Sequence, residues 1–193
     1  MPKKLILASQ SPRRAQILGQ LIGSFQTLPA DVEEKNLKSA HQTVAYNALL
    51  KAQHIATRNP DSWVIGSDTV VSLKDQSLGK PQNLPDAHQT LEKLSGRSHE
   101  VFTAVSLLNL SKGVNDSWIE TSQVTIKELN KQIIEQYFSL VNPLDKAGAY
   151  NIEEHGELII DHFDGEFENI MGLPKKSLLQ RFYQYSILSE DSV

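Results

Sequence analysis

The stretch Leu5-Ile6-Leu7-Ala8-Ser9-Gln10-Ser11-Pro12-Arg13-Arg14 sets the fold class of this 193-residue chain. Its first four residues are apolar, which is typical of a short buried strand. Ser11 and Pro12 favour a helix start directly afterwards, because serine caps a helix and proline suits the first helical position. Apolar residues then recur at helical spacing: Ile17, Leu18, Leu21, Ile22 and Phe25. A strand that leads into a capped helix predicts an α/β protein.

Helical and strand-like patterns alternate along the rest of the chain. Helices are expected over residues 43–57 and 86–94, after Asn130, and from Pro174. Strands are expected over residues 63–65, 70–73, 101–110 and 119–126, with residues 66–69 interrupting the first two. Residues 158–163 and 167–171 are expected to pair as a hairpin around Asp164-Gly165. The pattern predicts one α/β domain over residues 1–193, with helices packed on a mixed sheet.

Composition narrows the classes of function. The chain has no cysteine, which excludes disulfides, thiolate metal sites and cysteine nucleophiles. Its formal net charge is -4, whereas a protein that coats nucleic acid usually carries a basic surplus. We therefore expect no nucleic-acid partner, and any basic site must be local and suited to a small anion. No apolar run approaches membrane-spanning length or resembles a secretory signal, so no membrane partner is expected.

Ser9, Arg13 and Arg14 surround the expected start of the first helix. The first N–H groups of a helix lack intrahelical partners, and the helix dipole places positive potential there. Two arginines in that turn are disfavoured by the dipole unless a bound anion offsets the repulsion. The pattern indicates an anion site, in which serine hydroxyls add donors. The plainer alternative is an ordinary cap with two solvated arginines.

Asp68 interrupts an apolar run in the segment Gly66-Ser67-Asp68-Thr69-Val70-Val71. Burial of an unpaired carboxylate is costly, so this side chain needs a cation or hydrogen-bond donors nearby. A metal ion bound together with phosphate would supply the cation. The alternative is that Asp68 only caps a turn.

Four further clusters carry weaker signals. Lys80, in Gly79-Lys80-Pro81, places a charge suited to phosphate in a stiff loop, although a loop lysine is usually only solvated. Lys51 lies beside core positions of its helix and could instead extend to water. Glu34, in Glu33-Glu34, could hold a metal or act as a base, or belong to a solvated turn. In Asp145-Lys146-Ala147-Gly148-Ala149-Tyr150, small residues permit close approach of a ligand, or form a tight structural turn.

The order and spacing of these blocks resemble the Maf family, the septum-formation-inhibitor-like nucleotide pyrophosphatases. The resemblance covers almost the whole chain and also includes Lys51-Ala52, Leu94-Ser95-Gly96-Arg97 and Gly172-Leu173-Pro174. It implies an elongated mixed sheet flanked by helices, in two lobes with a central cleft, similar to inosine triphosphate pyrophosphatases. Members of the family are cytoplasmic and often homodimeric, so the resemblance also implies a cytoplasmic protein that can form a homodimer.

The same resemblance implies a chemistry. It is hydrolysis of a nucleoside triphosphate between the α- and β-phosphates, with Mg²⁺ or Mn²⁺ as the cofactor. Asp68 matches the family's proton acceptor. Positions that bind phosphate or metal, or assist catalysis, are matched by Ser9, Arg13, Arg14, Glu34, Lys51 and Lys80. We therefore expect Asp68, Glu34 and Lys80 to be catalytic and the first two of these to hold the metal.

The family has two substrate branches, and three positions tend to separate them. The dTTP/UTP branch shows arginine, threonine and glutamine there, and the 7-methyl-GTP branch shows tryptophan, glutamine and glutamate. This chain has Arg13, Thr69 and Glu153, so two of the three match dTTP/UTP. Because a glutamate accepts hydrogen bonds but cannot donate them as glutamine does, Glu153 could widen the range to CTP or modified nucleotides. The alternatives are a 7-methyl-GTP pyrophosphatase, or a non-catalytic cell-division regulator or nucleotide sensor.

Overall fold

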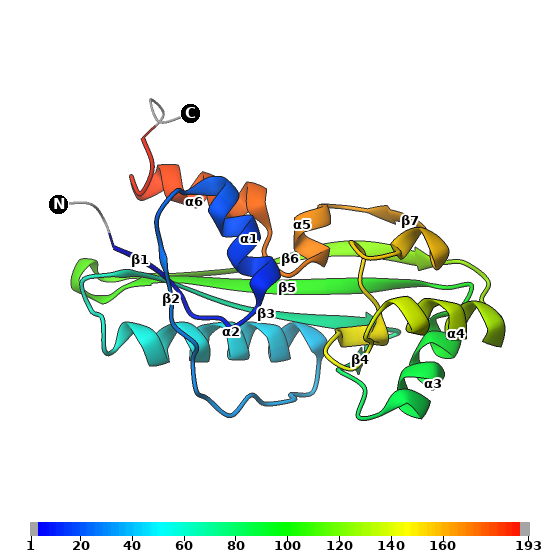
Figure 1. Ribbon diagram of the computed structural model, residues 1–193. Helices are drawn as coiled ribbons and strands as arrows, with labels where there is room; N and C mark the ends of the chain where they lie inside the picture. The colour runs from blue at the N-terminus through cyan, green and yellow to red at the C-terminus, as the bar shows by residue number, and fades with distance from the viewer. Residues whose placement is uncertain (1–3, 190–193) are drawn as a thin grey trace.

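The computed structural model describes residues 4–189 and is built on a seven-stranded mixed sheet (Figure 1). The strands are β1 (Leu5–Leu7), β2 (Gln26–Thr27), β3 (Trp63–Leu73), β4 (Gln76–Leu78), β5 (Ser98–Asn109), β6 (Val114–Ile126) and β7 (Ile160–Asp164). Their order is β2-β1-β3-β5-β6-β7, with β4 paired to β3. The strand β1 runs parallel to β2 and β3, and the other pairs are antiparallel. The predicted mixed sheet is confirmed.

Six α-helices flank this sheet within residues 4–189. They are α1 (Pro12–Leu21), α2 (Ala40–Ala56), α3 (Leu84–Leu94), α4 (Lys131–Leu140), α5 (Phe167–Ile170) and α6 (Lys175–Gln184). The predicted start of α1 is confirmed, since the Ser11 hydroxyl accepts a hydrogen bond from the Arg14 backbone N–H at 3.4 Å. The cap at Asn130 is confirmed in the same way, with the Ile133 N–H as donor at 2.9 Å. No helix of this described part is long and apolar enough to cross a bilayer.

The strand β3 is continuous, so the expected interruption at residues 66–69 is wrong. Antiparallel pairing with β5 runs without a break from Val64 opposite Leu108 to Ser72 opposite Glu100. Glycine, serine and aspartate have low strand propensity, and it is this ladder with a distant segment that keeps them extended.

The expected hairpin around Asp164-Gly165 is also wrong. The first half is the strand β7, but it pairs with β6, and the second half is the short helix α5. Phe167 packs against one apolar cluster and Ile170 against another. Residues i and i+3 are neighbours on one side of a helix, so a helical turn can place both side chains where the two clusters meet. The positive φ of 110° at Gly165 supplies the change of direction.

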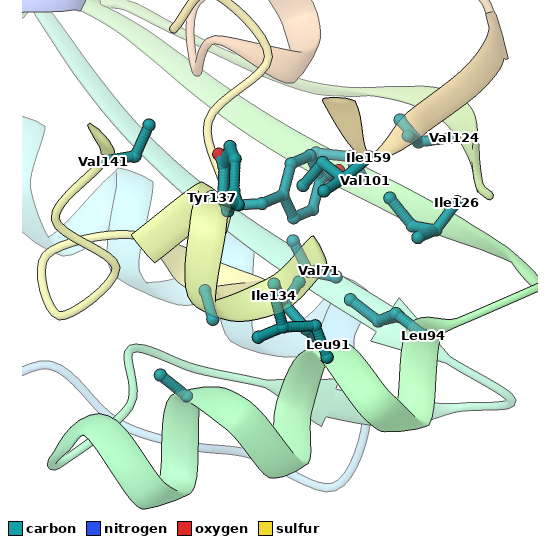
Figure 2. Packing of buried hydrophobic residues seen from close by; sticks show 13 residues of the cluster. Val71, Leu91, Leu94, Val101, Val124, Ile126, Ile134, Tyr137, Val141 and Ile159 are labelled. Atoms are coloured by element: carbon teal, nitrogen blue, oxygen red, sulfur yellow. The ribbon is translucent and has the colours of Figure 1, made fainter. Parts of the chain in front are cut away.

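Helices cover both faces of the sheet and divide the molecule into two lobes. Helix α2 lies on one face, whereas α1 and α6 lie on the other (Figure 1). An apolar cluster lies beneath α1 and α6. At the far end of the sheet, α3 and α4 enclose another apolar cluster, which includes Leu91, Ile134 and Tyr137 (Figure 2). The two lobes are therefore joined through the long strands β3 and β5.

The edge of β3 is open at the junction of the lobes. The strand pairs with β1 only up to Ile65 and with β4 only from Val71 onward. No described strand pairs with this edge over residues 66–70. Because side chains on a strand alternate between faces, Asp68 points toward α2 and Thr69 toward α1, and both reach the same opening.

Candidate active site

A cavity of about 1070 Å³ lies at this open edge. Its walls come from the start of α1, the loop before α2, the inner side of α2, the middle of β3, residues 78–80 and residues 145–154. Five cationic side chains line it, together with four carboxylates: Arg13, Arg14, Lys51, Lys80 and Lys146, and Glu34, Asp68, Asp145 and Glu154. In a chain of net charge -4, this lining therefore has a local excess of one positive charge, and binding of a small anion there stays a prediction.

Lys51 bridges the two carboxylates that the sequence singled out. Its Nζ lies 2.8 Å from Asp68 Oδ1 and 2.9 Å from Glu34 Oε1. The Lys51 and Asp68 side chains are only 10% and 9% exposed, whereas Glu34 is 54% exposed. Lys51 does not extend to water, and Asp68 is no turn cap. The buried ammonium draws a buried acid and a solvent-facing acid to one point.

Asn47 belongs to the same site, although no sequence pattern predicted it. Its Nδ2 donates to Asp68 Oδ2 at 3.3 Å and to the Lys35 carbonyl at 3.1 Å, and its Oδ1 accepts from the Lys35 N–H at 2.9 Å. It therefore ties the loop that carries Glu34 to the strand that carries Asp68. Thr43, Asn47 and Lys51 follow at i, i+4 and i+8, and this polar stripe within a buried helix was the available signal.

Arg14 is held by neutral acceptors. Its Nε donates to the Gly172 carbonyl at 2.8 Å, one Nη donates to Thr69 Oγ1 at 3.0 Å, and the other donates to Ser9 Oγ at 3.4 Å. Among residues 4–189, no carboxylate forms an ion pair with it. Burial is the largest effect and lowers the pKa of Arg14, and the charges of Asp68 and Glu34 offset this only in part. Because arginine stays protonated in proteins, this guanidinium carries a charge that no ion pair with a described carboxylate neutralises.

The other predicted residues are placed as follows. Arg13 and Lys80 line the cavity, and the Gly79 carbonyl next to Lys80 accepts a hydrogen bond from the Gly148 N–H at 3.2 Å. Glu153 is exposed and does not line the cavity, although Ile152 and Glu154 on either side of it do. The structure therefore brings together every predicted site residue except Glu153.

Lys146 is a further cation of the site. Its side chain is 9% exposed, and its Nζ lies 2.7 and 2.8 Å from the two carboxylate oxygens of Asp145. Burial tends to raise the pKa of Asp145, but its bonds to Lys146 and the charge of Arg13 bring it below its usual value. The signal in the sequence was the charged pair that precedes the small residues.

Comparisons with known proteins identify the family of this chain. A family model described as Maf-like protein matches residues 4–185. This chain belongs to the Maf family. A dTTP/UTP pyrophosphatase of Bacillus cereus is 37% identical over 187 residues, which cover 96% of this chain and 97% of the relative. One of Bacillus velezensis is 38% identical over 190 residues, with 97% and 99% covered.

A solved structure supports the fold. The Ham1 protein of Staphylococcus aureus matches this Maf chain with a TM-score of 0.57, and the match covers 95% of this chain and 100% of that one. The two sequences are 18% identical, so the likeness concerns the fold alone. The fold that the resemblance implied for this Maf protein is confirmed.

The donor set of this Maf site suits a hard divalent cation. Asp68 and Glu34 both contact Lys51 Nζ, so their carboxylate oxygens converge on one point. Mg²⁺ is commonly bound by one or two carboxylates together with substrate phosphates and water. Within residues 4–189, no group of three or more His, Asp or Glu side chains could hold a metal. The residues therefore fit a cation that arrives with a phosphate chain better than one held by protein alone.

His99 lies behind the cavity wall. It is buried, and its Nε2 lies 2.8 Å from the hydroxyl of Tyr150, which lines the cavity. Its Nδ1 is buried without a hydrogen-bond partner among the described residues. Burial lowers the pKa of His99 to about 4 and raises that of Tyr150. At neutral pH both His99 and Tyr150 are therefore uncharged.

The buried His99 is expected to make the fold acid-sensitive. Its pKa is about 4 when folded and 6.5 when free, so between these values only the unfolded chain binds the proton. The resulting loss should reach roughly 2 to 3 kcal/mol as the pH falls from 7 to 4.5. Urea unfolding at both pH values should show a smaller difference for His99→Gln than for wild type. Equal pH dependence in both proteins would contradict this assignment.

Proposed function

We propose that this Maf protein is a nucleoside triphosphate pyrophosphatase that hydrolyses dTTP and UTP to the monophosphate and pyrophosphate. One observation carries the proposal: a carboxylate pair bridged by Lys51 shares a cavity with Arg14, a guanidinium that bonds only to neutral acceptors among residues 4–189. Hydrolysis of a phosphoanhydride needs a carboxylate that accepts a proton from water and a cation that stabilises the negative charge of the phosphates. The cavity offers both. The names of the relatives support the same activity.

Asp68 is the proton acceptor in this proposal. Its Oδ1 accepts from Lys51. Its Oδ2, which among the described residues accepts only the longer bond from Asn47, would receive the proton of the attacking water. The water oxygen forms a bond to the α-phosphorus, and the bond from that phosphorus to the bridging oxygen breaks. The monophosphate and pyrophosphate are the two products.

The cationic side chains stabilise charge on the phosphates. Arg13 and Arg14 enter from the start of α1, where Ser9 and the helix N-terminus add donors. Lys80 enters from the opposite loop and would neutralise the charge that develops on the leaving pyrophosphate. Lys51 orients Asp68 and Glu34 while it contributes its own charge.

Asp68 and Glu34 would hold the divalent cation, Mg²⁺ or Mn²⁺. When bound, such an ion neutralises phosphate oxygens and makes a bound water more acidic. Glu34 is the more exposed of the two acids, so it would reach a cation that enters with the nucleotide.

Arg13 and Thr69 support the choice of dTTP and UTP, because both match that branch of the family. Glu153 departs from it, which keeps CTP, modified nucleotides and 7-methyl-GTP in the test. The proposal extends to a cytoplasmic location and a homodimer, as the family resemblance implies.

The proposal is tested by measuring pyrophosphate release from dTTP, UTP, CTP, GTP and 7-methyl-GTP, with Mg²⁺ and separately with Mn²⁺. We expect monophosphate and pyrophosphate in equal amounts, with dTTP and UTP as the fastest substrates. Faster release from 7-methyl-GTP would assign the other branch. No release from any nucleotide, with binding retained, would support the nucleotide sensor instead.

A further inference from the structure

A line of hydrogen bonds leads from Arg14 into the protein interior. Arg14 Nη2 donates to Thr69 Oγ1 at 3.0 Å, Thr69 Oγ1 lies 3.0 Å from Thr103 Oγ1, and Thr103 Oγ1 donates to the Asn169 carbonyl at 2.8 Å. Thr103 is fully buried and does not line the cavity. Thr103 therefore cannot touch a ligand in the cavity. Two hydrogen bonds, through Thr69, connect it to the Arg14 guanidinium, which can.

The direction of this line follows from the count of hydrogens. Each hydroxyl has one hydrogen, and the Asn169 carbonyl can only accept, so the Thr103 hydrogen is committed there. Thr69 must then donate to Thr103, which leaves its lone pairs to accept from Arg14. The line has one polarity, and each bond polarises the next.

The far end of the line is anchored. The Asn169 side chain donates to Ser122 Oγ at 2.9 Å and to the Val101 carbonyl at 3.3 Å. The carbonyl of Gly172, at the end of the same segment, accepts from Arg14 Nε at 2.8 Å and from Ser67 Oγ at 2.9 Å. Residues 169–172 thus hold Arg14 directly through the Gly172 carbonyl and indirectly through Thr103 and Thr69. They are themselves hydrogen-bonded to strands β3, β5 and β6.

We propose that Thr69 and Thr103 are positioning residues, which aim Arg14 at the phosphate chain of the nucleotide. This inference rests on the proposed function, since it requires a phosphorylated ligand in the cavity. Three donor positions of Arg14 are occupied by Gly172, Thr69 and Ser9, and its other N–H groups have no partner among the described residues. The line of hydrogen bonds through Thr69 and Thr103, here called the relay, orients these remaining N–H groups of Arg14. Thr69, expected from the sequence to bind substrate, then acts on it through Arg14.

The test removes the buried hydroxyl without changing the cavity. Thr103→Val keeps the shape of the side chain and is expected to lower kcat/KM for dTTP about 10-fold, the effect of a weakened bond to a charged group. Thr103→Ser restores the hydroxyl and should recover kcat/KM to within about 3-fold of wild type. Ser106→Ala is the matched control, because it removes another buried hydroxyl of β5, bonded to Ser117 at 2.8 Å, and should leave kcat/KM unchanged.

A double-mutant cycle separates positioning from a structural role. If Thr103 acts through Arg14, Thr103→Val should cost little further activity in an Arg14→Gln background. An equal loss in both backgrounds, or no loss from Thr103→Val in the wild-type background, would overturn the relay.

Calorimetric binding of inorganic pyrophosphate with Mg²⁺ tests the relay without turnover. We expect Thr103→Val to weaken this binding about 10-fold and Thr103→Ser to restore it. A wild-type protein that binds pyrophosphate but hydrolyses no nucleotide would overturn the proposed function and leave the relay standing. Equal pyrophosphate affinity in wild type and Thr103→Val would overturn the relay, whatever the nucleotide activity.

Discussion

Asp68→Asn is expected to lower kcat for dTTP by about 100- to 10,000-fold, the usual contribution of a positioned general base. Asparagine has nearly the same shape, but its amide cannot take the proton of the attacking water. Lys51 keeps its 2.9 Å contact with Glu34, so it is not left as a buried charge without a partner. The loss of stability should therefore stay below the roughly 3 to 5 kcal/mol of a fully broken buried pair. Pyrophosphate release and thermal unfolding measure the two effects.

The matched control for this variant is Asp161→Asn. Asp161 is exposed and pairs with His162, and neither residue lines the cavity, so the same change of charge should leave kcat as in wild type. A near-wild-type rate for Asp68→Asn would remove Asp68 from the role of proton acceptor. A lower rate accompanied by loss of the folded state would instead assign Asp68 a structural role.

Gly66→Ala is expected to have the largest effect on stability. Gly66 lies where β3 crosses α2, and an added Cβ would lie 2.7 Å from Ala52 N and closer still to the Ala48 carbonyl oxygen. Both contacts are with backbone, which cannot rotate away, so the helix must shift off the sheet. We expect a loss of at least about 3 kcal/mol, the upper range for overpacking, and a fall in Tm of roughly 6 to 12 °C.

The same shift should impair the active site. It would separate Lys51 on α2 from Asp68 on β3, so activity should fall even in the fraction that remains folded. Gly23→Ala is the control, because an added Cβ there meets nothing within 4 Å. A Tm for Gly66→Ala equal to that of the control would show that α2 moves at little cost.

Local patterns predicted the start of the fold and most of the chemistry. The strand before Ser9, the cap at Ser11 and the cap at Asn130 follow from rules that act over a few residues. Asp68 was recognisable because a carboxylate in an apolar run needs a partner, and its partner Lys51 lay on a predicted helix. The hairpin expected at Asp164 failed because the spacing of Phe167 and Ile170 also fits a helix, and the two clusters against which they pack selected the helix.

The sequence by itself determined the α/β class, the helix caps and the identity of the charged groups, because capping, periodicity and the cost of a buried charge are local. The tertiary structure decided how these groups are joined. Thr69 meets Thr103 across 34 residues, and Ser67 meets Gly172 across 105. The continuity of β3 likewise depends on β5. Such contacts arise from the register of the sheet and the packing of α5. No local sequence pattern predicts which distant residue a hydroxyl will bond to.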